Sequence, residues 1–162
     1  MFMSMGVRQG FVLAGCLASG LVALEQAQAA PVNRSGVITK FDGVDEIVEA
    51  CTTVTSFVTV PQMSRTFNIS GSASSVVVTF SGSASLSGQP FDTGFIRLTI
   101  DNAQVSPGEI PFVALDQGTG GHAFTWQSKS LAVGPHTARI QWRTDLGSQF
   151  CLDARSLVVL HR

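Results

Sequence analysis

Apolar and polar residues alternate in short stretches along the second half of the chain. The stretch FIRLTI, residues 95–100, places three aliphatic side chains on one side of an extended strand and Arg97 and Thr99 on the other. The stretch HTARIQWR, residues 136–143, does the same, with Ala138, Ile140 and Trp142 on the inward side and Arg139, Gln141 and Arg143 on the outward side. Both patterns predict β-strands with one side in a core and one side facing solvent.

A second kind of stretch is SGSASSVVVTFSGSASL, from Ser70 to Leu86, in which the tract SGSAS occurs twice. The residues between the tracts, Val76 to Phe80, are β-branched or aromatic and have the length of a strand. We therefore predict one strand here, between two serine-rich and glycine-rich turns.

Further strands are predicted at roughly ten-residue spacing, bounded by glycine, proline, serine and asparagine. Their residue ranges are 53–60, 66–70, 112–115, 122–129 and 157–161. Pro61 separates the first two, and Asp101-Asn102 is expected to form a turn. The last range is apolar on both sides, which predicts a central or covered strand.

One segment near the start of the folded region leaves two alternatives open. Val44, Ile47, Val48 and Cys51 follow the i, i+3, i+4, i+7 spacing of an amphipathic helix, with Asp42 placed to cap it. A helix of two turns has little stability alone, so an edge strand is the alternative for Val44–Cys51.

The first 29 residues have the pattern of a secretory signal peptide. Arg8 lies in a short polar start, an apolar segment follows, and Ala27-Gln28-Ala29 supplies small residues for cleavage. We expect residues 30–40 to form an extended segment, residues 41–162 a single domain, and the protein to be secreted or periplasmic. The tract Leu13-Ala14-Gly15-Cys16 resembles a bacterial lipobox, so a lipoprotein anchored through Cys16 is the alternative.

Two cysteines remain in the mature chain, Cys51 and Cys151. Because export leads to an oxidising compartment, we predict a disulfide between them. This bond places the beginning and the end of the folded region side by side. Together with the many short strands, it predicts an all-β fold: an antiparallel β-sandwich of jelly-roll type with at most one short N-terminal helix.

Composition excludes several function classes. Charged residues make up 13% of the chain, against roughly 25% in an average soluble protein. No basic patch is present that would hold nucleic acid or an anionic membrane surface, and no transmembrane segment is expected in the mature chain.

The sequence offers little support for catalysis or for a cofactor. The Gly-x-Ser-x-Gly motif of serine hydrolases is absent from the mature chain, and His122, His136 and His161 lack metal-ligand spacing. Four acidic residues are candidate ligands for a structural calcium ion, but they do not follow a known loop pattern. These are Asp42, Asp45, Glu46 and Asp116. We therefore predict that the protein is not an enzyme and holds no cofactor. A structural calcium ion stays an open alternative that no motif supports.

Binding is better supported. Trp126 follows a glycine-rich loop and shares one side of its strand with His122, and Asp116 lies at the same loop. An exposed tryptophan ring stacks on sugars or anchors a protein partner, although Trp126 and Trp142 also fit a core. Arg97, Arg139 and Arg143 form the alternative, a polar sheet surface that contacts acidic or hydroxyl-rich partners.

The function predicted from the sequence is that of a secreted, non-catalytic β-sandwich module that binds a glycan or a protein at a cell surface. One alternative is a structural subunit of an extracellular assembly, in which copies of the chain associate. A second alternative is a small secreted enzyme that uses His122 or Asp116.

Overall fold

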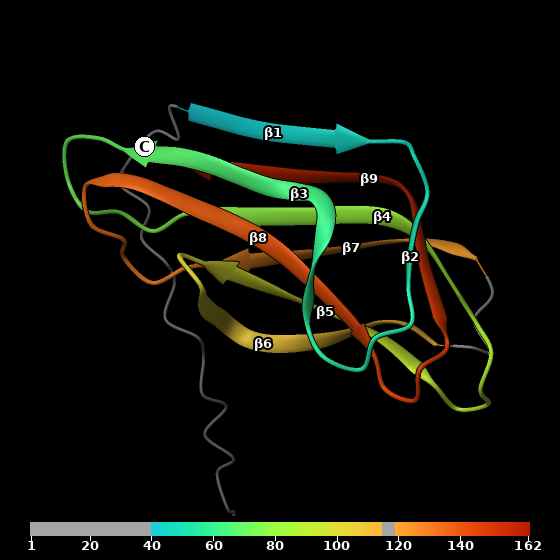
Figure 1. The fold of residues 1–162 in the computed structure, drawn as a ribbon. Coiled ribbons are helices and arrows are strands. Elements are labelled where there is room, and N and C mark those ends of the chain that lie inside the picture. Colours follow the sequence, from blue (N-terminus) through green and yellow to red (C-terminus); the bar gives the residue numbers. More distant parts are fainter. Residues whose placement is uncertain (1–39, 115–118) are drawn as a thin grey trace, which may run out of the picture. The chain divides into compact units, whose positions relative to one another are not determined.

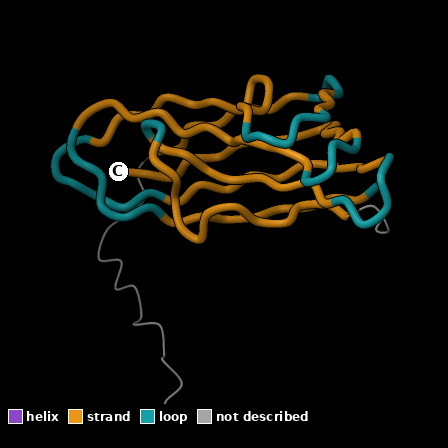
Figure 2. The backbone as a smooth tube through the Cα atoms, turned by 60° about the horizontal axis from the view of Figure 1, so that its bottom comes forward, coloured by secondary structure: helices purple, strands orange, loops and turns teal. Residues whose placement is uncertain are grey.

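Two antiparallel sheets pack face to face in the part of the chain that this computed structural model describes, residues 40–114 and 119–162 (Figure 1). Strands and loops account for all of these residues, and no helix is found among them (Figure 2). The prediction of an all-β sandwich is therefore confirmed. The expected signal peptide, Cys16 and Asp116 lie outside the described residues.

Sheet A contains five strands in the order β1-β9-β4-β7, with β2 also paired to β9. Their bounds are β1 Lys40–Glu46, β2 Ala50–Thr52, β4 Val77–Ser87, β7 Gly120–Gln127 and β9 Gln149–His161. Sheet B has the order β3-β8-β5-β6. Its strands are β3 Val58–Ile69, β5 Thr93–Ile100, β6 Ala103–Ala114 and β8 Gly134–Thr144.

The chain passes repeatedly from one sheet to the other. Among the strands of residues 40–114 and 119–162, β5 and β6 are the one consecutive pair that bonds directly, through the turn at Asp101-Asn102. Both turn residues have positive φ values, 51° and 69°, which Asp and Asn tolerate better than most residues. The first strand, β1, pairs with the last strand, β9, as the predicted disulfide required. The finer assignment to the jelly-roll type stays a prediction.

The core lies between the two sheets and is built from the inward side of each alternating strand. On β5 the buried residues are Ile96, Leu98 and Ile100, and on β8 they are Ala138, Ile140 and Trp142. This confirms the inward sides predicted for both strands, and it confirms Trp142 as a core residue. β9 lies between β4 and the strands β1 and β2, so its prediction as a central strand is also confirmed.

The disulfide is formed between Cys51 on β2 and Cys151 on β9, which face each other directly in the register of the two strands. The bond joins residues 100 positions apart. It attaches the short strand β2 to the centre of sheet A.

Several predicted element boundaries were wrong or left open, and among them β9 begins at Gln149 rather than at Leu157. The segment Val44–Cys51 is extended at both ends, in β1 and β2, so the strand alternative holds and the helix does not. β3 is one strand that runs through Pro61, because it lies at the edge of sheet B and its register breaks between Thr59 and Ser64. β6 begins at Ala103 rather than Phe112.

β4 also continues beyond the predicted turn, through the second SGSAS tract to Ser87. Its inward side there carries small or apolar residues, including the buried Ala84 and Leu86. The outward serines are only partly exposed, and the hydroxyl of Ser81 pairs with that of Ser156 at 2.9 Å. The first SGSAS tract lies before β4, as predicted. Within the described ranges, no helix is long and apolar enough to cross a membrane.

Candidate functional site

Three arginines predicted as binding residues lie together on the outward side of sheet B. Arg97 is on β5, and Arg139 and Arg143 are on β8. These two strands are neighbours and form the centre of sheet B. In the register of the two strands, Arg97 lies opposite Gln141, Thr99 opposite Arg139, and Phe95 opposite Arg143. Because side chains two positions apart on a strand share one side, all three guanidinium groups face away from the core.

Neutral amide side chains fix the orientation of two of these arginines. Arg97 donates from Nε to Gln141 Oε1 at 2.8 Å and from Nη1 to Gln104 Oε1 at 3.1 Å. Arg139 donates from Nη1 to Asn102 Oδ1 at 3.0 Å. Among the described residues, Nη2 of Arg97 and Nη2 of Arg139 have no hydrogen-bond partner, so they stay available as donors.

Arg143 is held by carboxylates. Its Nε and Nη2 donate to the two oxygens of Glu109 at 3.3 and 3.4 Å, and its Nη1 donates to Asp145 Oδ1 at 2.8 Å. The hydrogen bond with Asp145 raises the pKa of Arg143, partial burial opposes this rise, and Glu109 adds to it. Arg143 therefore carries a fixed positive charge with a fixed orientation.

Two phenylalanine rings complete this surface. The ring of Phe57, in the segment before β3, lies 4.0 Å from the guanidinium carbon of Arg97 and 5.4 Å from that of Arg143. The ring of Phe95 lies 4.4 Å from the same carbon of Arg143. All three contacts are of the cation–π type. Sequence reasoning missed Phe57, because it lay inside a range expected to be a regular strand.

We call this surface the arginine face; it consists of Arg97, Arg139, Gln141, Arg143, Phe57 and Phe95. Its chemistry combines planar N–H donors, amide groups and two partly exposed carboxylates, Glu109 and Asp145. The side chains of these two acids are 46% and 55% exposed. The three arginines and these two carboxylates together carry one net positive charge, and the carboxylate of Asp101 lies near Arg139 as well. Such an arrangement can form paired hydrogen bonds with hydroxyl or carboxylate groups of a ligand.

The other predicted binding residues lie elsewhere. Trp126 is 1% exposed, between the sheets, with its ring 4.8 Å from that of Phe124. The interpretation of Trp126 as an exposed ring that contacts a ligand is therefore wrong, because its side of β7 faces the core. His122 is on the same side of β7, half-buried, with its ring 5.3 Å from that of Phe112. Neither residue approaches the arginine face, which belongs to the opposite sheet.

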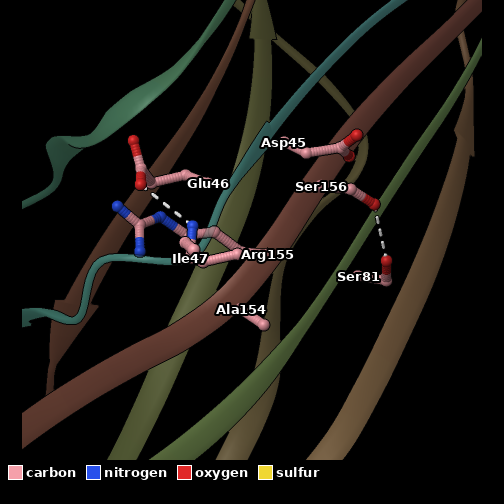
Figure 3. A pocket seen from close by; sticks show the side chains of 7 residues that line it. All are labelled: Asp45, Glu46, Ile47, Ser81, Ala154, Arg155 and Ser156. Carbon is pink, nitrogen blue, oxygen red and sulfur yellow. Dashed lines mark hydrogen bonds between the residues drawn. The ribbon is translucent and has the colours of Figure 1, made fainter.

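A hollow of about 290 Å³ lies on sheet A, where β1, β4 and β9 meet (Figure 3). Arg155 lines it but is 4% exposed, and its Nη1 donates to the backbone oxygens of Val48, Leu152 and Asp153 at 2.6–3.2 Å. Burial lowers the pKa of Arg155, against the opposing charges of Glu46 and Asp153. Glu46 accepts two hydrogen bonds from the backbone N–H groups that follow it. Glu46 and Arg155 therefore hold the β1–β2 connection. The polar groups that the hollow offers a ligand are the exposed carboxylate of Asp45 and the paired hydroxyls of Ser81 and Ser156.

Of the four acids predicted as calcium candidates, Asp42, Asp45 and Glu46 lie in the described part of the chain, where they do not share one site. Asp42 accepts from His161 Nε2 at 2.8 Å and from Arg65 at 3.3 Å. Asp45 is exposed beside Ser156, its partner in the β1–β9 register, and Glu46 accepts from the backbone N–H groups of Ile47 and Val48. Among the described residues, one group of potential ligands lies close enough to share an ion, namely Glu49, Cys51 and Cys151. Its two sulfur atoms form the disulfide and are not available as thiolates.

Two histidine–carboxylate pairs are present, and both serve the fold. His136 Nδ1 lies 2.6 Å from Asp101 Oδ2, and its Nε2 lies 2.9 Å from the backbone oxygen of Ala132. His161 bonds to Asp42 and, through its other nitrogen, to the backbone oxygen of Arg162 at 3.1 Å. Because both ring nitrogens are bound to structural partners, neither histidine is placed to activate a hydroxyl nucleophile.

No protein-family model and no curated protein matches the chain. Among solved structures, the EclA C-terminal domain, a sugar-binding protein, is similar at a TM-score of 0.42 and 11% identity, over 82% of this chain and 88% of that one. Dimeric latent PorU from Porphyromonas gingivalis is similar at 0.37 and 14% identity, over 74% of this chain and 13% of that one. A family two carbohydrate esterase from Cellvibrio japonicus is similar at a TM-score of 0.30 and 15% identity, over 76% of this chain and 34% of that one. These likenesses concern the fold alone, so the function is argued from the side chains.

Proposed function

We propose that the protein is a non-catalytic carbohydrate-binding module and that the arginine face is its binding surface. The ligand class is a hydroxyl-rich glycan that carries acidic groups, such as uronates or sulfates. The protein would meet this ligand outside the cell or in the periplasm, in keeping with the export signal expected from the sequence.

The observation that carries the proposal is the fixed orientation of Arg97 and Arg139. Their partners Gln141, Gln104 and Asn102 are neutral, so the arginines keep their full charge while their planes are held in place. A binding surface whose side chains are already ordered loses less conformational entropy when a ligand binds. The unpartnered Nη2 groups supply donors for ring hydroxyls or for an acidic group.

The composition of the surface also favours a sugar over an apolar ligand. Phe57 and Phe95 contribute flat rings, but both lie against guanidinium groups, so the surface combines apolar and polar contacts. Glu109 and Asp145 add acceptors for hydroxyl protons. The arginine face lies on the regular strands β5 and β8, which fixes the spacing between its groups.

The test is binding of the purified mature protein to immobilised neutral and acidic glycans, measured for the wild type and for Arg139→Ala. Arg139 is chosen because its one side-chain partner, Asn102, lies in a surface turn, so the fold should tolerate its removal. Lys40→Ala on β1 removes the same charge from sheet A and serves as the matched control. We expect at least a roughly tenfold loss of affinity for Arg139→Ala and no change for Lys40→Ala.

Salt dependence separates the arginine face from non-specific adsorption. Binding to an acidic glycan should weaken between low and physiological salt, and less so in Arg139→Ala. Equal binding by the two variants, or the absence of binding to any glycan by a folded wild type, would overturn the proposal.

A further inference from the structure

The four edges of the two sheets differ in how they are protected against pairing with another strand. Natural proteins block such edges with charges, prolines or irregular register, because the backbone N–H and C=O groups of an edge strand are free to bind. β1, at one edge of sheet A, carries charges at Lys40, Asp42, Asp45 and Glu46. β3, at one edge of sheet B, contains Pro61 and a break in its register.

β6, the other edge of sheet B, is blocked in the same way. It contains Pro107 and Pro111, and its pairing with β5 shifts register twice. Three of the four edges are therefore unsuited to continue a sheet.

β7, the remaining edge of sheet A, has none of these protections. Its sequence GGHAFTWQ contains no Asp, Glu, Lys, Arg or proline. Its register with β4 is unbroken over eight residue pairs, from Gly120 opposite Ala84 to Gln127 opposite Val77. Within the described part of the chain, β4 is its sole partner strand. A regular, uncharged edge of this length is a template for strand addition.

The surface beside this edge is uncharged as well. The outward residues of β7, namely Gly121, Ala123, Thr125 and Gln127, are exposed and small or neutral. Their neighbours on β4 are Ser83, Ser81, Thr79 and Val77. Thr79 and Thr125 bond to each other through their hydroxyls at 2.9 Å. Within β7 and the part of β4 that pairs with it, no charged side chain therefore opposes the approach of a second strand.

We propose that β7 pairs antiparallel with β7 of a second copy of this chain, joining the two A sheets into one continuous sheet. We choose a second copy as the occupant because an edge strand without charges can lie opposite itself across a two-fold axis without repulsion. Any charged residue near the centre of β7 would then face a like charge across the axis, and β7 carries none. When the pairing is centred on Ala123 or on Phe124, the outward side chains of the two β7 strands lie on the same side of the joined sheet.

This arrangement has a consequence for the arginine face, which rests on the proposed function. The two-fold axis of an antiparallel pair runs perpendicular to the joined sheet, so both B sheets lie on the same side of it. Two arginine faces would then point in the same direction, toward one surface. Bivalent attachment to a surface polymer is tighter than either contact alone.

The test is the molecular mass of the mature protein with its disulfide intact, measured by light scattering and sedimentation from about 5 to 500 µM. We expect a monomer–dimer equilibrium in the wild type. Ala123→Lys and Ala123→Glu each place like charges at the interface and should weaken the dimer at least about tenfold. Mixing the two variants should restore it, which distinguishes a lost interface from a damaged fold.

Ala154→Lys is the matched control, since Ala154 is an exposed alanine on β9, an interior strand of sheet A. It should leave the dimer unchanged. Amide hydrogen exchange of residues 120–127 should slow with increasing protein concentration in the wild type and not in Ala123→Lys. The proposal is overturned by a monomer at every concentration, by a dimer that Ala123→Lys does not weaken, or by protection in a monomer of those β7 amides that point away from β4.

The two proposals fail separately. A monomer that still binds glycan through Arg139 would refute the β7 interface alone. A dimer that binds no glycan would refute the proposed function alone.

Discussion

The carboxylate of Asp92 accepts a hydrogen bond from the backbone N–H of Ser148 at 2.8 Å, which joins the β4–β5 connection to the β8–β9 connection. The same carboxylate accepts from the N–H groups of Thr93, Asp145 and Leu146 at 2.6–2.9 Å. Asp92 is 1% exposed. One side chain therefore orders two loops and fixes the position of Asp145 beside Arg143.

Stability should depend on the charge of Asp92. Burial alone raises the pKa of Asp92, but the N–H donors of Ser148 and Leu146 and the Ser148 hydroxyl outweigh it and lower the pKa from 3.8 to about 2. The stabilisation is therefore complete above about pH 4 and is lost as the pH falls through about 2. We expect Asp92→Asn to lower the free energy of unfolding by about 2 kcal/mol at pH 7. Urea unfolding at several pH values measures this, and an unchanged pH profile in the variant would contradict it.

The pair His136 and Asp101 gives a second pH-dependent prediction. The hydrogen bond with Asp101, assisted by the backbone oxygen of Ala132, raises the pKa of His136. The stabilisation that the charged His136–Asp101 pair gives the fold is thus complete below pH 6.5, the ordinary pKa of histidine. It is lost as the pH rises through the raised pKa of His136. In Asp101→Asn the pKa of His136 should fall, as followed by an NMR titration of the imidazole. A His136 pKa that stays raised in Asp101→Asn would show that the carboxylate is not its cause.

The disulfide should contribute a large part of the net stability. It closes a loop of 100 residues, for which chain-entropy estimates give about 4–5 kcal/mol. The double variant Cys51→Ser, Cys151→Ser should lose about this amount in urea unfolding. A loss below about 1 kcal/mol would mean that the denatured chain is already restricted without the bond.

Trp126 should matter for stability and not for binding. Because it is fully buried between the sheets, Trp126→Ala should cost about 3–5 kcal/mol. Trp126→Phe keeps most of the buried volume and should retain the glycan affinity of the wild type. A selective loss of binding in a stable Trp126→Phe would place the ligand at sheet A instead of the arginine face.

Alternation along single strands was sufficient to predict the inward and outward sides of β5 and β8. Arg97, Arg139 and Arg143 could therefore be placed on one surface before the structure was known. What the sequence did not disclose were their partners. Gln104 lies on β6, predicted to begin later, and Phe57 lies in a segment predicted as a strand.

Serine and proline account for most of the boundary errors. Ser81 to Ser87 have weak strand propensity, yet β4 lies between β7 and β9 and is held by both. Pro61 was expected to separate two strands, and it occurs within β3 because that strand lies at a sheet edge. Position in the sheet, which a single sequence does not reveal, outweighed local propensity in each case.

The most direct test of the proposed function is the affinity of the wild type, Arg139→Ala and Lys40→Ala for the same acidic glycan panel, with each fold verified by circular dichroism. We predict saturable binding that Arg139→Ala weakens at least about tenfold and that Lys40→Ala leaves unchanged. Equal affinities for all three proteins, or no binding at all by the folded wild type, would show that the arginine face is a solvated sheet surface and not a carbohydrate-binding site.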